Sequence, residues 1–115
     1  MSYLFVYGTL MRNQENHTII ENEEFLGEFT TMDKFTMYIN EYIPFVVEDK
    51  NYHINGELYK ISDFVQKQID FLEKGYEKKY IYLNGFNTNA LIYVYNGFIS
   101  PNWYKCIDGN YLHYI

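Results

Sequence analysis

The sequence of 115 residues is poor in arginine, cysteine and proline, and the shortage of arginine excludes one class of binding site. Arg12 is the only arginine, so the chain cannot build a clamp of paired guanidinium groups on a phosphate or carboxylate. The 9 basic residues are outnumbered by 15 acidic ones, which gives a net charge of −6. Binding to a nucleic-acid backbone needs clustered cations, so we expect no nucleic-acid partner.

Cys106 is the only cysteine, and this excludes an intrachain disulfide. We interpret Cys106 as a small buried side chain rather than as a nucleophile. No apolar run approaches the roughly 18 residues of a membrane span, and no charged-then-apolar leader opens the chain. We therefore expect no membrane partner and a cytoplasmic location.

The motifs of several common catalytic sites are also missing. The three histidines, His17, His53 and His113, lack the spacing of a zinc site. No serine lies in a Gly-x-Ser-x-Gly turn, so a serine nucleophile is not indicated. Gly8 follows an apolar segment but stands alone, unlike the three glycines of a dinucleotide-binding turn.

What the sequence does contain is the composition of one folded domain, residues 1–115. The apolar fraction is 48% and the charged fraction 21%, which is typical of a globular chain. Several strands, one clear helix and short connections predict an α+β domain with a mixed, strongly curved sheet. Apolar patterning predicts strands over 3–7, 43–47, 53–61, 79–86 and 90–95, two strands or one bent strand over 25–39, and a short helix over 17–24. The tail from Phe98 is expected to be irregular.

The main helix is predicted over residues 62–74. Ser62 can cap its first turn, and Gly75 is placed to end it. Three apolar residues, Val65, Ile69 and Leu72, form one stripe at helical spacing.

Glu73 is the candidate general base that the residues alone indicate. It falls about 40° from Ile69 on the helical wheel, so its side chain should lean toward the core or a cleft beside it. Burial and the negative end of the helix dipole both raise the pKa of a carboxyl group, and a raised carboxylate beside an aromatic cleft suits proton transfer. An ordinary solvated helix-end glutamate fits the same pattern, and on residue pattern alone it is the simpler interpretation.

Six blocks of the chain, in order, resemble the motifs of one known family. They are Phe5-Val6-Tyr7-Gly8-Thr9-Leu10 with Asn16-His17, Glu24-Phe25-Leu26-Gly27, Ile43-Pro44-Phe45-Val46, Gly56-Glu57-Leu58-Tyr59, Ile69-Asp70-Phe71-Leu72-Glu73, and Asp108-Gly109-Asn110-Tyr111 with Tyr114. The chain resembles the gamma-glutamylcyclotransferase-like family over nearly its whole length.

The resemblance implies a reaction, a substrate class and a set of site residues. Members release 5-oxoproline from a gamma-glutamyl compound by intramolecular aminolysis, without metal or cofactor. Carried over, Glu73 is the catalytic acid and base, Tyr7, Gly8, Thr9 and Leu10 hold the glutamyl end, and Tyr80 also binds substrate. The short chain resembles the branch that acts on gamma-glutamylamines such as gamma-glutamyl-epsilon-lysine, and we expect a monomer or weak homodimer that binds a small gamma-glutamyl substrate.

Some positions depart from the family pattern and leave alternatives open. Tyr80 is followed by Ile81 and Tyr82, where relatives often have an arginine, and residues 74–79 look one residue longer than in close relatives. One alternative keeps the chemistry on gamma-glutamyl amino acids or a gamma-glutamyl-protected metabolite. Another is a small-ligand or protein-binding module without turnover. Glu57 is a competing carboxylate, which we interpret as structural because its strand position can pair it with a neighbour.

Overall fold

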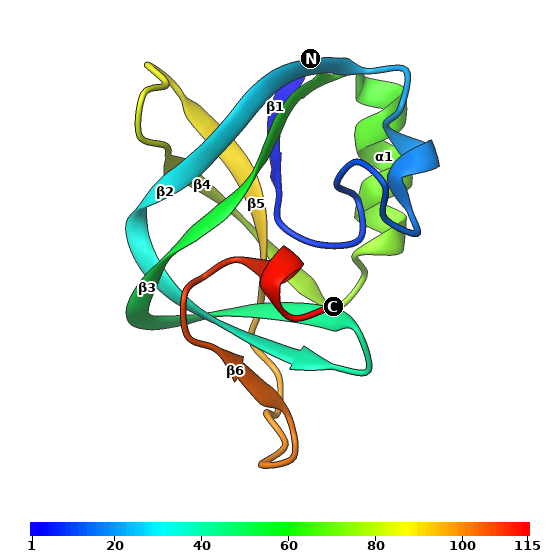
Figure 1. Ribbon diagram of the computed structural model, residues 1–115. Coiled ribbons are helices and arrows are strands. Elements are labelled where there is room, and N and C mark those ends of the chain that lie inside the picture. The colour runs from blue at the N-terminus through cyan, green and yellow to red at the C-terminus, as the bar shows by residue number, and fades with distance from the viewer.

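A six-stranded sheet curled around its own core makes up most of the computed structural model, which describes every residue from 1 to 115 (Figure 1). Its strands are β1 (Ser2–Val6), β2 (Glu24–Asn40), β3 (Ile43–Ile61), β4 (Tyr76–Tyr82), β5 (Asn89–Tyr95) and β6 (Tyr104–Cys106). They lie in the order β4-β5-β1-β3-β2-β6, with β1 and β5 parallel and all other neighbours antiparallel. The predicted α+β class with a mixed, curved sheet is confirmed.

Strands β2 and β3 form one long hairpin that bends sharply, and this bend curls the sheet (Figure 1). Of the two alternatives left open over 25–39, the structure has one bent strand, and the prediction of separate strands over 43–47 and 53–61 is wrong. Both are halves of β3, joined through polar residues that bulge from the ladder. The buried Thr36 hydroxyl donates to the Asp49 carbonyl at 2.7 Å and accepts from the Asn51 amide at 2.7 Å, so it holds the bulge in place.

Helix α1 (Asp63–Leu72) confirms the main predicted helix and its cap. The Ser62 hydroxyl accepts a hydrogen bond from the Val65 N–H at 3.2 Å, and Gly75 takes a φ of +98° beyond the last turn. Ile69 is fully buried against the sheet, whereas Leu72 is 41% exposed. The stripe therefore ends at Ile69, and the last turn of the helix lies at a surface opening rather than over the core.

Three other predictions need correction. Residues 17–24 form only a single 3₁₀ turn, η1 (His17–Ile19), because the polar run after Ile20 has no apolar side chain to bury. The Glu23 carboxylate instead accepts from the Ser62 N–H at 2.8 Å, which ties this segment to the start of α1. The strand predicted over 79–86 begins at Tyr76 and ends at Tyr82, and the tail expected to be irregular contains the short strand β6.

The end of the chain folds into a turn that braces the β2–β3 hairpin. Gly109 has a φ of +70° and packs so closely that a Cβ there would lie 2.0 Å from the His53 carbonyl oxygen. The turn leads into the 3₁₀ helix η2 (Tyr111–His113), where buried Tyr111 donates its hydroxyl to the Tyr42 carbonyl. Since Ile43 and Pro44 follow directly, this contact fixes the stretch of chain that reaches the cavity described below.

Cys106 is fully buried at the end of β6, and burial raises the pKa of its thiol to about 11. The expected burial of Cys106 is confirmed, and a raised thiol pKa disfavours the thiolate that a nucleophile needs. The helices are all too short and too polar to span a bilayer.

Candidate active site

One cavity of about 350 Å³ opens where the end of β1, the start of β3 and the last turn of α1 meet. It is lined by Phe5, Val6, Tyr7, Gly8, Thr9, Leu10, Glu15, Asn16, Ile43, Pro44, Leu72, Glu73, Tyr76 and Tyr93. The loop predicted to hold substrate and the predicted catalytic glutamate are therefore brought into one hollow, although more than sixty residues of sequence separate them.

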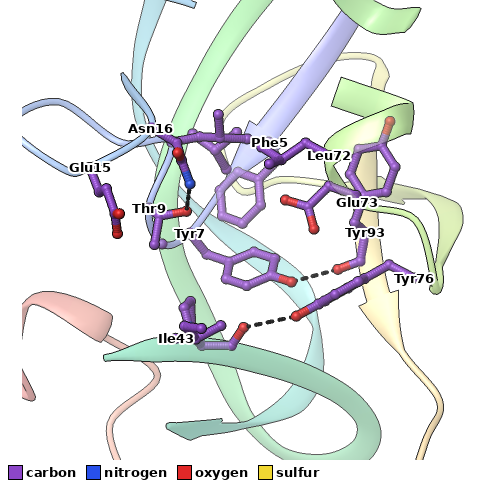
Figure 2. A pocket seen from close by; sticks show the side chains of 14 residues that line it. Phe5, Tyr7, Thr9, Glu15, Asn16, Ile43, Leu72, Glu73, Tyr76 and Tyr93 are labelled. Carbon is purple, nitrogen blue, oxygen red and sulfur yellow. Dashed lines mark hydrogen bonds between the residues drawn. The ribbon is translucent and has the colours of Figure 1, made fainter. Parts of the chain in front are cut away.

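Glu73 is the residue that ends α1, and its side chain enters this cavity. Its backbone N–H donates to the Ile69 carbonyl at 2.8 Å, which completes the last helical turn and fixes the direction of the side chain. Figure 2 shows the carboxylate pointing into the space bounded by Phe5 and Tyr7. No protein group donates a hydrogen bond to this carboxylate, and no cation pairs with it. Burial raises the pKa of Glu73 to about 7, so it can both accept and release a proton near neutral pH.

The loop at the end of β1 supplies unpaired backbone donors. Gly8 and Thr9 use their carbonyl groups to accept from the N–H of Met11 at 3.0 Å and of Asn16 at 2.8 Å. The N–H groups of Gly8, Thr9 and Leu10 donate no hydrogen bond within the chain. These donors are suited to binding an anionic or carbonyl oxygen of a ligand.

Close packing fixes the shape of this loop. A Cβ at Gly8 would lie 2.2 Å from Cγ of Pro44, so only glycine lets the loop lie against the start of β3. The Asn16 side chain donates to the Thr9 hydroxyl at 3.0 Å, closing the loop from its other end (Figure 2). The unpaired N–H groups are therefore held in place before any ligand binds.

Three tyrosines form the wall around Glu73, and each directs its hydroxyl elsewhere. Tyr7 donates to the Tyr93 carbonyl at 2.6 Å and Tyr76 donates to the Pro44 carbonyl at 3.4 Å (Figure 2). Tyr93 donates to the Asp70 carboxylate. Burial raises the pKa values of Tyr7, Tyr76 and Tyr93, so all three stay protonated at neutral pH. The wall thus shields Glu73 from part of the surrounding water without donating a hydrogen bond to it.

The structure gives no support to Tyr80 as a substrate-binding residue. Tyr80 lies on β4 with its side chain 70% exposed, and it does not line the cavity. Tyr76, three residues after Glu73 in the sequence, lines the cavity instead. The sequence pattern did not indicate Tyr76, because β4 was predicted to begin at residue 79 and it begins at Tyr76. It did not indicate Tyr93 either, because β5 is buried on both faces and its sequence does not alternate between apolar and polar residues.

Glu57 is buried but has a full set of partners. It accepts from the Arg12 backbone N–H at 2.9 Å, from Arg12 Nε at 3.0 Å and from the Tyr59 hydroxyl at 2.9 Å. The structural interpretation of Glu57 is confirmed. The only arginine of the chain thus ties the loop after β1 to β3 and lies outside the cavity.

Two of the three histidines contact backbone carbonyl groups, and His113 contacts the Asp108 carboxylate. Nδ1 of His17 lies 2.9 Å from the Leu10 carbonyl oxygen, and Nδ1 of His53 lies 2.8 Å from the Thr31 carbonyl oxygen. Nowhere in the chain do three histidine, cysteine, aspartate or glutamate side chains gather as metal ligands would.

Known proteins share both the sequence pattern and the fold. A Methanocaldococcus jannaschii protein, provisionally named a gamma-glutamylcyclotransferase, is 44% identical over 75 residues, which cover 64% of this chain and 62% of that protein. The gamma-glutamylaminecyclotransferase of Rattus norvegicus is 29% identical over 82 residues, covering 64% of this chain and 55% of that protein. The matches thus span about three fifths of these curated relatives.

The fold extends further than these sequence matches. The crystal structure of an uncharacterised Pyrococcus horikoshii protein superposes with a TM-score of 0.81 at 21% identity, covering 98% of this chain and 93% of that one. The family model described as gamma-glutamyl cyclotransferase, AIG2-like, matches residues 4–112, which include every residue that lines the cavity. The chain therefore belongs to the gamma-glutamyl cyclotransferase, AIG2-like family.

Proposed function

We propose that this protein releases 5-oxoproline from gamma-glutamylamines by intramolecular aminolysis, with Glu73 as general acid and base. One observation carries the proposal: an unpaired, largely buried carboxylate and three residues with unpaired backbone N–H groups line the same cavity. The carboxylate suits a substrate ammonium, and the N–H groups suit the oxygens of its glutamyl end. The rat relative, by its name a cyclotransferase for gamma-glutamylamines, supports the amine class. Gamma-glutamyl-epsilon-lysine is one such compound.

The reaction begins when Glu73 takes a proton from the α-ammonium group of the substrate. The freed nitrogen attacks the γ-carbonyl carbon, which forms the carbon–nitrogen bond of a five-membered lactam. The bond from that carbon to the departing amine then breaks. The attacking nitrogen loses two protons in all and the departing nitrogen gains two, so no water is consumed and Glu73 returns to its starting state.

The raised pKa of Glu73 suits both halves of this cycle. A carboxylate with a pKa of about 7 is a stronger base than an ordinary glutamate, and its protonated form still donates readily to the departing nitrogen. Because attack occurs within one molecule, the main remaining task is to hold the substrate folded. The donors of Gly8, Thr9 and Leu10 and the tyrosine wall perform that task.

We further propose that the protein acts in the cytoplasm on a small-molecule substrate, and that it is a monomer or a weak homodimer. The single buried cysteine is consistent with a reducing compartment.

The test is 5-oxoproline release from purified protein given gamma-glutamyl-epsilon-lysine, gamma-glutamyl-alanine and a gamma-glutamyl alkylamine. Wild type should release 5-oxoproline, and Glu73→Gln should not. Glu21→Gln, which alters an exposed glutamate away from the cavity, serves as the matched control and should behave as wild type. A folded wild-type protein that binds these compounds and releases nothing would contradict the proposal and favour a binding module.

A further inference from the structure

The charges that line the cavity are all negative. Glu73 and Glu15 are the only acidic residues among those that line it, and no lysine, arginine or histidine is present. Figure 2 shows the two glutamates on opposite sides of the cavity, with Tyr7 and Thr9 between them. Glu15 is exposed to solvent and makes no hydrogen bond or ion pair within the chain.

Three of the cations near the site in sequence are held elsewhere, and Lys74, which directly follows Glu73, is exposed and does not line the cavity. Arg12 is paired with Glu57, Lys78 with Asp70 at 3.2 Å, and Lys79 with Glu48. None of these three cations lines the cavity. A substrate carboxylate at the Glu15 side would therefore meet a negative charge and no compensating cation among the residues that line the cavity.

The proposed reaction decides which part of the substrate reaches Glu15. The α-nitrogen must lie at Glu73, and lactam closure folds the glutamyl carbons back onto that nitrogen. The glutamyl α-carboxylate can use the N–H groups of Gly8, Thr9 and Leu10. The far end of the departing amine is then the part that extends away from Glu73, across Thr9 toward Glu15.

We propose that Glu15 makes the cavity selective for departing amines whose far end carries a positive charge, such as diamines, and unfavourable to those whose far end carries a net negative charge. This inference rests on the proposed function and narrows its substrate class. Glu15 is a specificity residue in this account, because it contacts the far end of the substrate and not the reacting atoms. A diamine would pair its second ammonium group with Glu15, whereas a leaving group whose far end carries a carboxylate and no ammonium group would be repelled. Lysine released from its epsilon-nitrogen carries both groups at its far end and so is not excluded.

The test compares three gamma-glutamyl compounds that share one pentamethylene spacer. Their departing amines are 1,5-diaminopentane, hexylamine and 6-aminohexanoate, so the far ends are cationic, neutral and anionic. We expect kcat/KM for 5-oxoproline release to fall in that order, by about threefold or more at each step in low salt, because a partly exposed charge pair is worth up to about a factor of five. High salt should reduce the differences in kcat/KM among the three compounds, because it screens the charge of Glu15.

Two variants assign the effect to Glu15. Glu15→Gln should bring the ratio between the cationic and neutral compounds close to one, and Glu15→Lys should make the anionic compound the best of the three. Glu21→Gln should keep the wild-type order. Equal rates for all three compounds in wild type, or an unchanged order in Glu15→Lys, would overturn the inference.

Equilibrium binding separates this inference from the proposed reaction. Calorimetric titration of Glu73→Gln, which should leave the compounds intact, should show affinities in the same charge order. If no compound yields 5-oxoproline but the affinities follow that order, the proposed reaction fails and the charge selectivity stands. If all three are turned over with equal efficiency, the reaction stands and the selectivity fails.

Discussion

Glu57 is buried and Glu73 is partly buried, yet the protein treats the two carboxylates in opposite ways. Glu57 is 4% exposed and accepts three hydrogen bonds, two of them from Arg12. Glu73 is largely buried beside a cavity and accepts none. A desolvated carboxylate with donors stabilises the fold, whereas one without donors is kept at a cost in stability and is ready to take a proton. The difference shows that burial alone does not mark a catalytic carboxylate, and that its partners must be counted too.

The largest expected effect is on catalysis and separates the two glutamates directly. Glu73→Gln should lower kcat for 5-oxoproline release by about 10²–10⁴-fold, the usual contribution of a general acid–base group, because the amide cannot accept the substrate proton. The variant should keep its circular-dichroism spectrum. Activity within tenfold of wild type would show that another group transfers the proton.

The next effect is a loss of stability, which we expect on substitution of Glu57, the glutamate that is paired with Arg12. Glu57→Gln should lower the free energy of unfolding by about 3 kcal/mol at pH 7, because it removes a buried charge from its arginine partner. Urea unfolding measures this loss. Glu28→Gln is the matched control, since Glu28 lies 3.9 Å from the same arginine but is 74% exposed, and should change stability by less than about 0.5 kcal/mol. Equal losses in the two variants would contradict the structural role given to Glu57.

Removing the charge of Glu73 should instead stabilise the protein in alkaline solution. Its pKa is about 7 when folded against a usual 4.5, so the folded state binds a proton that the unfolded state releases between these values. The contribution of Glu73 to the free energy of unfolding is greatest below pH 4.5, falls as the pH rises toward 7 and stays low above pH 7.

Glu73→Gln mimics the protonated form at every pH. It should therefore match wild type near pH 4.5 and exceed it by about 2 kcal/mol at pH 8, a figure reduced from the full linkage value because the side chain keeps some contact with water. Urea unfolding at both pH values measures the gap. A gap of the same size at both would mean that the charge of Glu73 is not the cause.

The smallest expected effect is on the pH dependence of the reaction. The acidic limb of kcat/KM should rise with the loss of one proton and a midpoint near pH 7, because only deprotonated Glu73 accepts the substrate proton. At pH 6 the rate should be about tenfold below its plateau. Steady-state rates from pH 5 to 8.5 measure this limb, and a limb centred near pH 4.5 would indicate a fully solvated carboxylate.

The sequence predicted the parts of the molecule that local patterns determine. Ser62 and Gly75 delimit α1 through their own backbone and side-chain chemistry, and the position of Glu73 at the end of that helix follows. The link between Glu73 and the loop of Tyr7 to Leu10 came from a family resemblance, because no periodicity can bring together residues so far apart in the chain.

Other features depend on tertiary contacts that no local pattern contains. The polar run from Glu48 to Asn51 is typical of a loop, yet β3 continues through it because the buried hydroxyl of Thr36 holds the bulge. The sequence predicted that Tyr76 lies before its strand. Tyr76 is in fact the first residue of β4 to pair with β5, and this pairing sets its position near Glu73. Likewise, the lack of a donor for Glu73 depends on where three tyrosine hydroxyls point.

The most direct test of the account is a titration of the Glu73 carboxyl group itself. Carbon-detected NMR of protein labelled at the glutamate side-chain carboxyl carbon follows each group with pH, and Glu73→Gln assigns the signal that disappears. The account predicts a midpoint near 7 for that signal. A midpoint near 4.5 would mean that Glu73 is solvated or paired, and it would contradict the assignment of Glu73 as the poised acid and base of the cavity.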